Sequence, residues 1–183
     1  MSLDSASLLI EQIVITMMTT DAEEQGELAS LFAKLQLMEP GPESQSVENE
    51  IWEIWCHHEE PEAVEAMEQV VEALSRGSLA DANEGLNRMV RRWPTWAEAW
   101  NKRATAYYLI GDYLKSAEDI ERTLELEPRH FGALSGLGLI MVALGNEEAA
   151  INAFEATLAI HPFAEGARQN LETLRARQQQ RTI

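Results

Sequence analysis

Residues 56–60, with the sequence CHHEE, have the densest run of metal-binding residue types in this 183-residue chain. Thiolate, imidazole and carboxylate groups are the usual ligands of zinc. Neighbouring residues on a helix point roughly 100° apart, however, so these side chains cannot converge on one ion. His130 and His161 stand beside prolines without a second ligand at metal spacing. We therefore expect a solvated helix end at residues 56–60, two structural or exposed histidines, and neither a metal nor a cofactor.

Other catalytic signatures are missing from the sequence. It contains no HExxH, GxSxG or GxxxxGK[ST] motif, which mark metalloproteases, serine hydrolases and P-loop nucleotide sites. The glycine-rich stretch 132–138 is a poor dinucleotide loop, because no strand precedes it and Met141 stands where the last glycine would fall. We therefore expect a protein that is not an enzyme.

The charge of the chain is strongly acidic, with 14 Lys and Arg against 31 Asp and Glu and a formal net charge of −17. This balance argues against nucleic acid or an anionic membrane surface as the main partner. Residues 1–62 hold 14 acidic residues and only Lys34 as a base. A basic cluster follows at Arg88, Arg91 and Arg92. These arginines either pair with the acidic extension or dock an acidic partner.

Cysteine content and hydropathy bear on localisation. Cys56 is the single cysteine, so no internal disulfide or thiolate zinc site can form. The apolar run 8–18 is shorter than the roughly 20 residues needed to span a bilayer. A signal peptide requires a positively charged segment before its apolar run, but no Lys or Arg precedes residues 8–18. We expect no membrane insertion and a cytoplasmic protein, or an exported one if the natural start lies upstream.

A spacing of 34 residues organises the second half of the chain. Glycines, prolines, small residues and two apolar columns all keep this spacing: Gly77, Gly111 and Gly145; Pro94, Pro128 and Pro162; Ala82, Ser116 and Ala150; Leu86, Ile120 and Phe154; Val90, Leu124 and Leu158. Each unit is interpreted as two antiparallel helices. The glycine ends the first helix and the proline ends the second.

These units resemble the tetratricopeptide-repeat (TPR) family. The central unit has its bulky, small and aromatic residues at Trp100, Ala104 and Tyr107, then Gly111, Asp112, Tyr113 and Pro128, and the third has Leu134, Gly138, Gly145, Ala150, Phe154 and Pro162. The first unit is weaker, because Gln69 occupies a usually apolar column. The resemblance implies an all-α helix-turn-helix solenoid of three repeats, 63–96, 97–130 and 131–164, with a C-terminal capping helix from Glu165 to about Arg177 within 165–183. The segments LASLFAKLQ and EIWEIWCHHEEPEA are also similar to small bacterial TPR proteins of unassigned partner.

The N-terminal region 1–62 is predicted to form three helices, 5–18, 22–38 opened by Asp21 and 47–58 opened by Ser46, with EPGPESQS as a loop. Trp52 and Trp55 make one apolar face, which we expect to cap the exposed side of the first repeat. The apolar stripe of the first helix must be buried against the second helix, in the groove of the repeats, or against a second copy of the chain.

In the TPR family the first helices of successive repeats line a concave, peptide-binding face. The corresponding positions imply a groove formed by Met67, Val71, Asn101, Thr105, Tyr108, Gly132, Ser135 and Leu139. Co-chaperones of the family grip a terminal carboxylate with Lys, Asn and Arg, but here those positions hold Met67, Val71, Lys102, Gly132 and Gly136. We therefore expect a ligand bound through apolar anchors and a few hydrogen bonds.

Gly132 and Gly136 each cost a helix up to about 1 kcal/mol relative to alanine. Close approach of a ligand backbone or of the N-terminal helix would compensate for this cost, while the alternatives are local frustration or a role in starting the helix. The leading functional prediction is a non-catalytic adaptor or scaffold that binds a protein or peptide. The alternative is a structural homo-oligomer, such as a homodimer, assembled through the apolar N-terminal helix.

Overall fold

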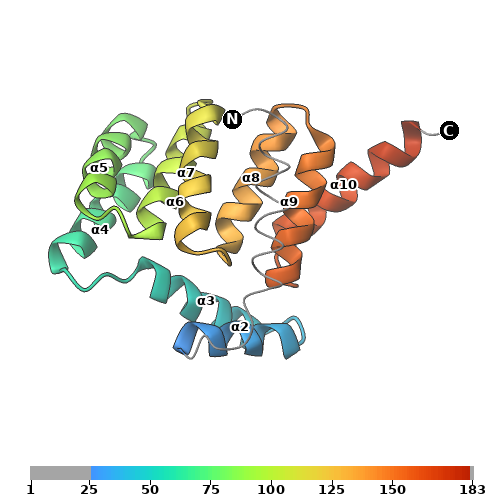
Figure 1. Cartoon of the computed structure of the whole chain (residues 1–183), viewed down its shortest axis with the longest axis horizontal. Coiled ribbons are helices and arrows are strands. Elements are labelled where there is room, and N and C mark those ends of the chain that lie inside the picture. Colours follow the sequence, from blue (N-terminus) through green and yellow to red (C-terminus); the bar gives the residue numbers. More distant parts are fainter. Residues whose placement is uncertain (1–25, 182–183) are drawn as a thin grey trace. The chain divides into compact units, whose positions relative to one another are not determined.

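The computed structural model describes residues 26–181, and all regular elements within them are α-helices (Figure 1). In chain order these are α2 (Glu27–Leu37), α3 (Pro42–Cys56), α4 (Pro61–Ser75), α5 (Leu79–Arg92), α6 (Ala97–Leu109), α7 (Tyr113–Leu126), α8 (Phe131–Ala143), α9 (Glu147–Ile160) and α10 (Glu165–Arg181). The predicted all-α class and the paired helices are confirmed. The predicted helix 5–18 and its three modes of burial lie outside the described residues. Over 26–181, the helices lack the length and apolar character needed to cross a membrane.

The described chain divides into two compact units. One contains residues 26–51 and 128–181, and the other contains Trp52–Glu127, so the boundary falls inside α3. The first repeat, α4 and α5, and the second, α6 and α7, belong to the unit Trp52–Glu127. The third repeat, α8 and α9, belongs to the other unit together with α2 and α10.

The glycines of the 34-residue series stand at the turns inside the repeats. Gly77, Gly111 and Gly145 have φ values of 71°, 80° and 77°. Beyond Gly111, the backbone N–H of Asp112 donates to the carbonyl oxygen of Tyr107 at 2.9 Å, which closes the end of α6. A side chain would strain this left-handed conformation, so glycine is the residue that ends the helix at least cost. The predicted helix ends are therefore confirmed.

Capping side chains begin the second helices of the second and third repeats, α7 and α9. Asp112 accepts a hydrogen bond from the backbone N–H of Lys115, and Asn146 accepts one from Ala149. Such caps satisfy donors that the first turn of a helix leaves unpaired. The prolines of the period stand two residues beyond the last residues of α5, α7 and α9, just after the C-cap, where a helix cannot easily continue.

Small residues allow the two helices of a repeat to approach closely. Between α6 and α7, the Ser116 hydroxyl donates to the carbonyl oxygen of Ala104 at 2.7 Å. Between α8 and α9, a Cβ added to Gly138 would lie 2.5 Å from the ring of Phe154. The 34-residue columns of small residues are therefore positions of direct helix contact.

A largely buried ion pair within the second repeat also bonds to the first repeat. The guanidinium of Arg103 donates two hydrogen bonds of 2.7 Å to the carboxylate of Asp119 and a third, of 2.9 Å, to the side-chain oxygen of Asn87. Hydrogen bonding to Asp119 raises the pKa of Arg103, although burial opposes the shift. Arg103 occupies the column that holds the buried Leu137 in the third repeat. The two hydrogen bonds to Asp119 stabilise the charge of Arg103 at a position that is apolar in the third repeat.

The predicted starts of two N-terminal helices need correction. Gly26 has an extended backbone with φ −179°, so α2 begins at Glu27 rather than at Ala22, and residues 22–25 lie outside the described range. α3 begins at Pro42 instead of Val47, so residues 42–46 of the predicted loop EPGPESQS are helical. Proline is well accepted in a first helical turn, and Ser44 accepts a hydrogen bond from the backbone N–H of Gly41 at 3.0 Å.

In the unit formed by residues 26–51 and 128–181, α2 packs against the ends of the third repeat. Phe32 meets Phe131 edge-on with ring centroids 6.4 Å apart. The side-chain amide of Gln36 donates to the carbonyl oxygens of Ala159 and Ile160 at 2.8 and 2.7 Å. These are terminal carbonyls of α9, which lack partners within their own helix.

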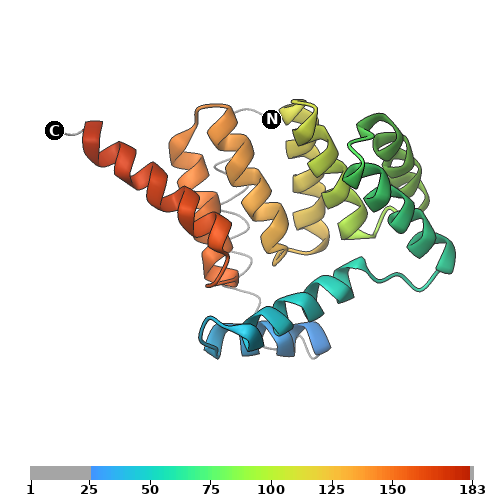
Figure 2. The ribbon, with the colours of Figure 1, turned by 180° about the vertical axis from the view of Figure 1, so that it is seen from behind.

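α10 continues beyond the third repeat and packs on α9 through the buried residues Ala167, Leu171 and Leu174 (Figure 2). It begins at Glu165 as predicted, but it extends past Arg177 to Arg181, where Arg181 pairs with Glu147 at 2.7 Å. A helix with one apolar and one polar side is what the end of a repeat array needs.

The two histidines beside prolines are structural. His130 is fully buried, and its Nδ1 accepts a hydrogen bond from the backbone N–H of Ala133 at the start of α8. His161 is 2% exposed, and its Nδ1 accepts from the N–H of Phe163 just beyond α9. The sequence left open whether these histidines are structural or exposed, and both are structural.

Candidate functional site

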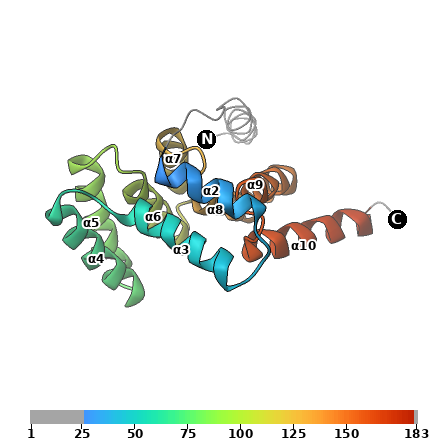
Figure 3. The ribbon, with the colours of Figure 1, turned by 90° about the horizontal axis from the view of Figure 1, so that it is seen from below.

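The last turn of α3 lies against the beginning of α6 (Figure 3). The indole N–H of Trp96 donates to the carbonyl oxygen of Trp55 at 2.8 Å. The ammonium of Lys102 lies 5.6 Å from the ring centroid of Trp52, which packs edge-on against Trp55. The prediction that both tryptophans cover the exposed side of the first repeat was wrong. Trp52 lies beside Lys102 of the second repeat, and the carbonyl oxygen of Trp55 accepts from Trp96 at the end of the first repeat, so both stand at the junction of the two repeats.

A buried polar cluster lies on α6 beneath this contact. Glu98 is fully buried, and its carboxylate lies 2.6 Å from the ammonium of Lys102 and accepts from the Asn101 amide at 2.9 Å. Burial alone would lower the pKa of Lys102, but the charge and hydrogen bond of Glu98 outweigh it and raise that pKa. Burial, and then the charge of Glu98, raise the pKa of the Cys56 thiol. The cysteine is thus held protonated and is a poor nucleophile.

Metal chemistry finds no support in this region. Across residues 26–181, no three His, Cys, Asp or Glu side chains are placed to hold a metal ion. His58 lies between two indoles, with its ring centroid 4.9 Å from Trp96 and 5.7 Å from Trp93. It is half-buried rather than part of a fully solvated helix end, so that prediction was wrong for this residue.

The residues predicted to line a peptide-binding groove differ in exposure. Met67 is 5% exposed and belongs to the apolar core of the first repeat, and Asn101 is bound to Glu98. Val71 and Thr105 are exposed and Tyr108 is half-buried. Gly132, Ser135 and Leu139 are half-buried on α8, in the other unit.

Within the unit Trp52–Glu127, the open part of the predicted surface lies toward the C-terminal ends of α4 and α6. Val71 is 47% exposed and stands 34 residues before Thr105, at the same position of its repeat. Leu109 lies one helical turn beyond Thr105 and is 55% exposed. We did not single out Leu109 from the sequence. Leu109 follows Thr105 by four residues, so the two side chains lie on the same face of α6. This spacing could have identified Leu109 from the sequence.

The outward face of the first repeat is polar. Glu65, Gln69 and Glu72 are exposed there, whereas Ala99 and Ala106, which stand 34 residues after Glu65 and Glu72, are buried against the preceding repeat. Gln69 therefore marks the first member of the stack rather than a damaged repeat, because a terminal repeat needs a polar outer face.

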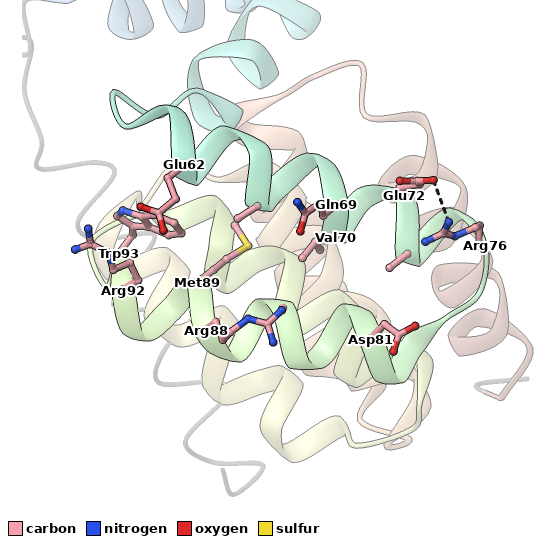
Figure 4. A pocket seen from close by; sticks show the side chains of 13 residues that line it. Glu62, Gln69, Val70, Glu72, Arg76, Asp81, Arg88, Met89, Arg92 and Trp93 are labelled. Carbon is pink, nitrogen blue, oxygen red and sulfur yellow. Dashed lines mark hydrogen bonds and ion pairs between the residues drawn. The ribbon is translucent and has the colours of Figure 1, made fainter.

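That face is nevertheless hollowed. A groove with a cavity volume of about 530 Å³ runs between α4 and α5 (Figure 4). Two members of the predicted basic cluster, Arg88 and Arg92, line it, and they pair with Glu84 and Glu60 respectively. Glu60 belongs to the acidic extension, so the predicted pairing with that extension holds for Arg92, while Arg88 pairs on its own helix.

Solved structures define the class of the fold. The Sgt2 TPR domain from Aspergillus fumigatus superimposes with a TM-score of 0.63 at 22% identity, covering 67% of this chain and 83% of that one. The first TPR domain of Spaghetti (RPAP3), solved with an HSP90 peptide, superimposes with a TM-score of 0.60 at 20% identity, covering 62% of this chain and 90% of that one. The fold is therefore a TPR solenoid.

Sequence comparison gives the family. The tetratricopeptide-repeat profile matches residues 102–165. A TPR repeat-containing protein of Rhizobium etli is 30% identical over 164 residues, covering 90% of this chain and 80% of the relative. The chain belongs to the tetratricopeptide-repeat family, which confirms the resemblance seen in its repeats.

Proposed function

We propose that this chain is a non-catalytic protein-interaction module that acts as an adaptor or scaffold. It binds a peptide or helical segment of another protein along the exposed positions of α4 and α6. The carrying observation is the pair of large apolar side chains Val71 and Leu109, 47% and 55% exposed, on either side of the polar Thr105 in the repeat register. Apolar anchors beside hydrogen-bonding groups are typical of surfaces that bind a peptide.

The contact of α3 with α6 limits where a ligand binds. Trp52 and Trp55 cover the beginning of α6, where Glu98 and Asn101 are buried. Because that half of the helix is occupied by the protein's own chain, the ligand uses the C-terminal halves of α4 and α6.

The ion pair between Lys102 and Glu98 argues against a ligand held by its terminal carboxylate. Lys102 stands at one of the positions that grip such a group in co-chaperones of the family, but its ammonium lies 2.6 Å from the Glu98 carboxylate. Met67 and Val71 occupy two further positions of that grip and carry no charge. The supported ligand is therefore a segment recognised through apolar side chains.

Affinity capture tests the proposal. The full chain, immobilised, is exposed to a lysate of cells that produce it naturally, beside Val71→Glu combined with Leu109→Glu. Leu114→Glu is the matched control, because Leu114 is also 55% exposed but lies on α7. We expect a polypeptide that wild type and control retain and the double variant loses. Retention of the same polypeptides by all three proteins contradicts the proposed surface.

A further inference from the structure

The groove on the outward face of the first repeat has the dimensions of a helix-binding site. Its lining runs from Glu62 to Arg76 along α4 and from Asp81 to Trp93 along α5, which is nearly the whole length of both helices. At 1.5 Å per residue this is about 20 Å. Figure 4 shows Glu62, Arg92 and Trp93 at one end of the groove and Arg76 and Asp81 at the other.

The floor of the groove is apolar. It includes Ala66, Val70 and Met89, together with Gly85. A Cβ at Gly85 would lie 2.9 Å from the Val70 side chain, so the glycine lets α5 come close to α4 at this point.

The second repeat shows which kind of element fits such a face. There α5 packs against α6, and Ala99 and Ala106 are buried beneath it. Within residues 26–181, no helix takes the equivalent place on the first repeat, where Glu65 and Glu72 stay exposed. An α-helix laid along the groove would therefore fit its shape.

Charge distinguishes the two rims. On the α5 side, Arg88 and Arg92 are four residues apart, and their ion pairs with Glu84 and Glu60 are largely exposed. Exposed pairs contribute little and exchange partners at low cost. Beside them, the buried indole nitrogen of Trp93 has no acceptor among the described residues. Beside Arg88 and Arg92 the α5 rim is cationic, with Asp81 at its far end, whereas the α4 rim carries Glu62 and Glu72, with Arg76 at its far end.

We propose that the groove between α4 and α5 is a second docking site, which takes an amphipathic α-helix of a partner protein. The helix lays its apolar stripe on the floor and sets carboxylates, spaced four residues apart, against Arg88 and Arg92. This site goes beyond the proposed function. It is separate from the surface of Val71 and Leu109, and either site can fail without the other.

A synthetic helical peptide of defined sequence tests the proposal. The probe is 14 residues long, as α5 is, with a leucine stripe, two glutamates four apart on one flank and glutamines on the other. It is titrated into the full chain, into Arg88→Glu combined with Arg92→Glu, and into Arg175→Glu combined with Arg181→Glu. The last protein has the same net charge as the second, and its altered arginines are exposed on α10. Amide chemical shifts report where the probe binds.

We expect shifts on α4 and α5 that saturate below about 1 mM, with affinity reduced at least about tenfold in the Arg88 and Arg92 variant. Replacing the probe's glutamates by lysines should restore binding to that variant. The Arg175 and Arg181 variant should bind as the wild type does, and Val71→Glu with Leu109→Glu should leave the affinity unchanged. The proposal is overturned by shifts confined to the surface of Val71 and Leu109, by equal affinity in both arginine variants, or by no binding.

Discussion

The indole N–H of Trp96 donates to the carbonyl oxygen of Trp55 across 2.8 Å, in a buried setting and over 41 residues of sequence. This bond joins the end of the N-terminal region to the first helix of the second repeat. Near this bond, Trp52 lies beside Lys102, which pairs with the buried Glu98. The proposed binding surface on α6 therefore begins beyond a contact made by residues outside the repeats.

Trp96→Phe should lower the free energy of unfolding by about 1–3 kcal/mol, because it removes a buried hydrogen bond and part of the indole packing. Trp100→Phe is the matched control. Its indole N–H also donates to a backbone carbonyl, that of Pro94 at 3.0 Å, but in an exposed setting. Urea unfolding of both variants measures the difference. Equal losses would show that the bond to Trp55 has no special weight.

Alkaline pH should weaken the fold through Cys56. Its pKa in the folded chain is raised above the ordinary value of 9.0, so its contribution is complete below pH 9 and is lost as pH rises through the folded pKa. One proton gives a slope of at most about 1.4 kcal/mol per pH unit. Cys56→Ser should remove this slope between pH 9 and 10.5, below the ordinary pKa of Lys102. Parallel stability profiles for wild type and Cys56→Ser would contradict the prediction.

Arg103→Met should cost about 3 kcal/mol, because it leaves the Asp119 carboxylate buried without its bidentate partner. The double variant Arg103→Met with Asp119→Leu should recover most of that loss. Arg122→Met, which removes a partly exposed pair with Glu125, should cost less than about 1 kcal/mol. Thermal and urea unfolding test the series. Additive losses in the double variant would mean that the two side chains do not act as a pair.

Gly138→Ala should destabilise the third repeat by about 1–3 kcal/mol, since the new methyl group would lie 2.5 Å from the Phe154 ring. Gly166→Ala provides the comparison, because nothing lies within 4 Å of its added Cβ in α10. That variant should be neutral or stabilising by up to about 1 kcal/mol. Calorimetric melting of both proteins gives the answer, and a stabilised Gly138→Ala would refute close contact of α8 with α9.

The repeats were predictable because their signals are local and periodic. Gly77, Gly111 and Gly145 need their conformation at each turn, and this requirement is visible at 34-residue spacing. The position of α3 on α6 has no period, and it depends on a donor at Trp96 that is far away in sequence. Asn101 is buried beside Glu98, to which its amide donates, and this could not be derived from its own column. The role of Gln69 likewise depends on which repeat is first in the stack.

The central claim is that exposed side chains of α4 and α6 bind a polypeptide. It is tested most directly by titration calorimetry of the captured polypeptide against wild type, Val71→Glu with Leu109→Glu, and Leu114→Glu. The account predicts at least about tenfold weaker binding to the double variant and unchanged binding to Leu114→Glu, with all three proteins equally folded by circular dichroism. The same affinity for all three proteins would contradict it.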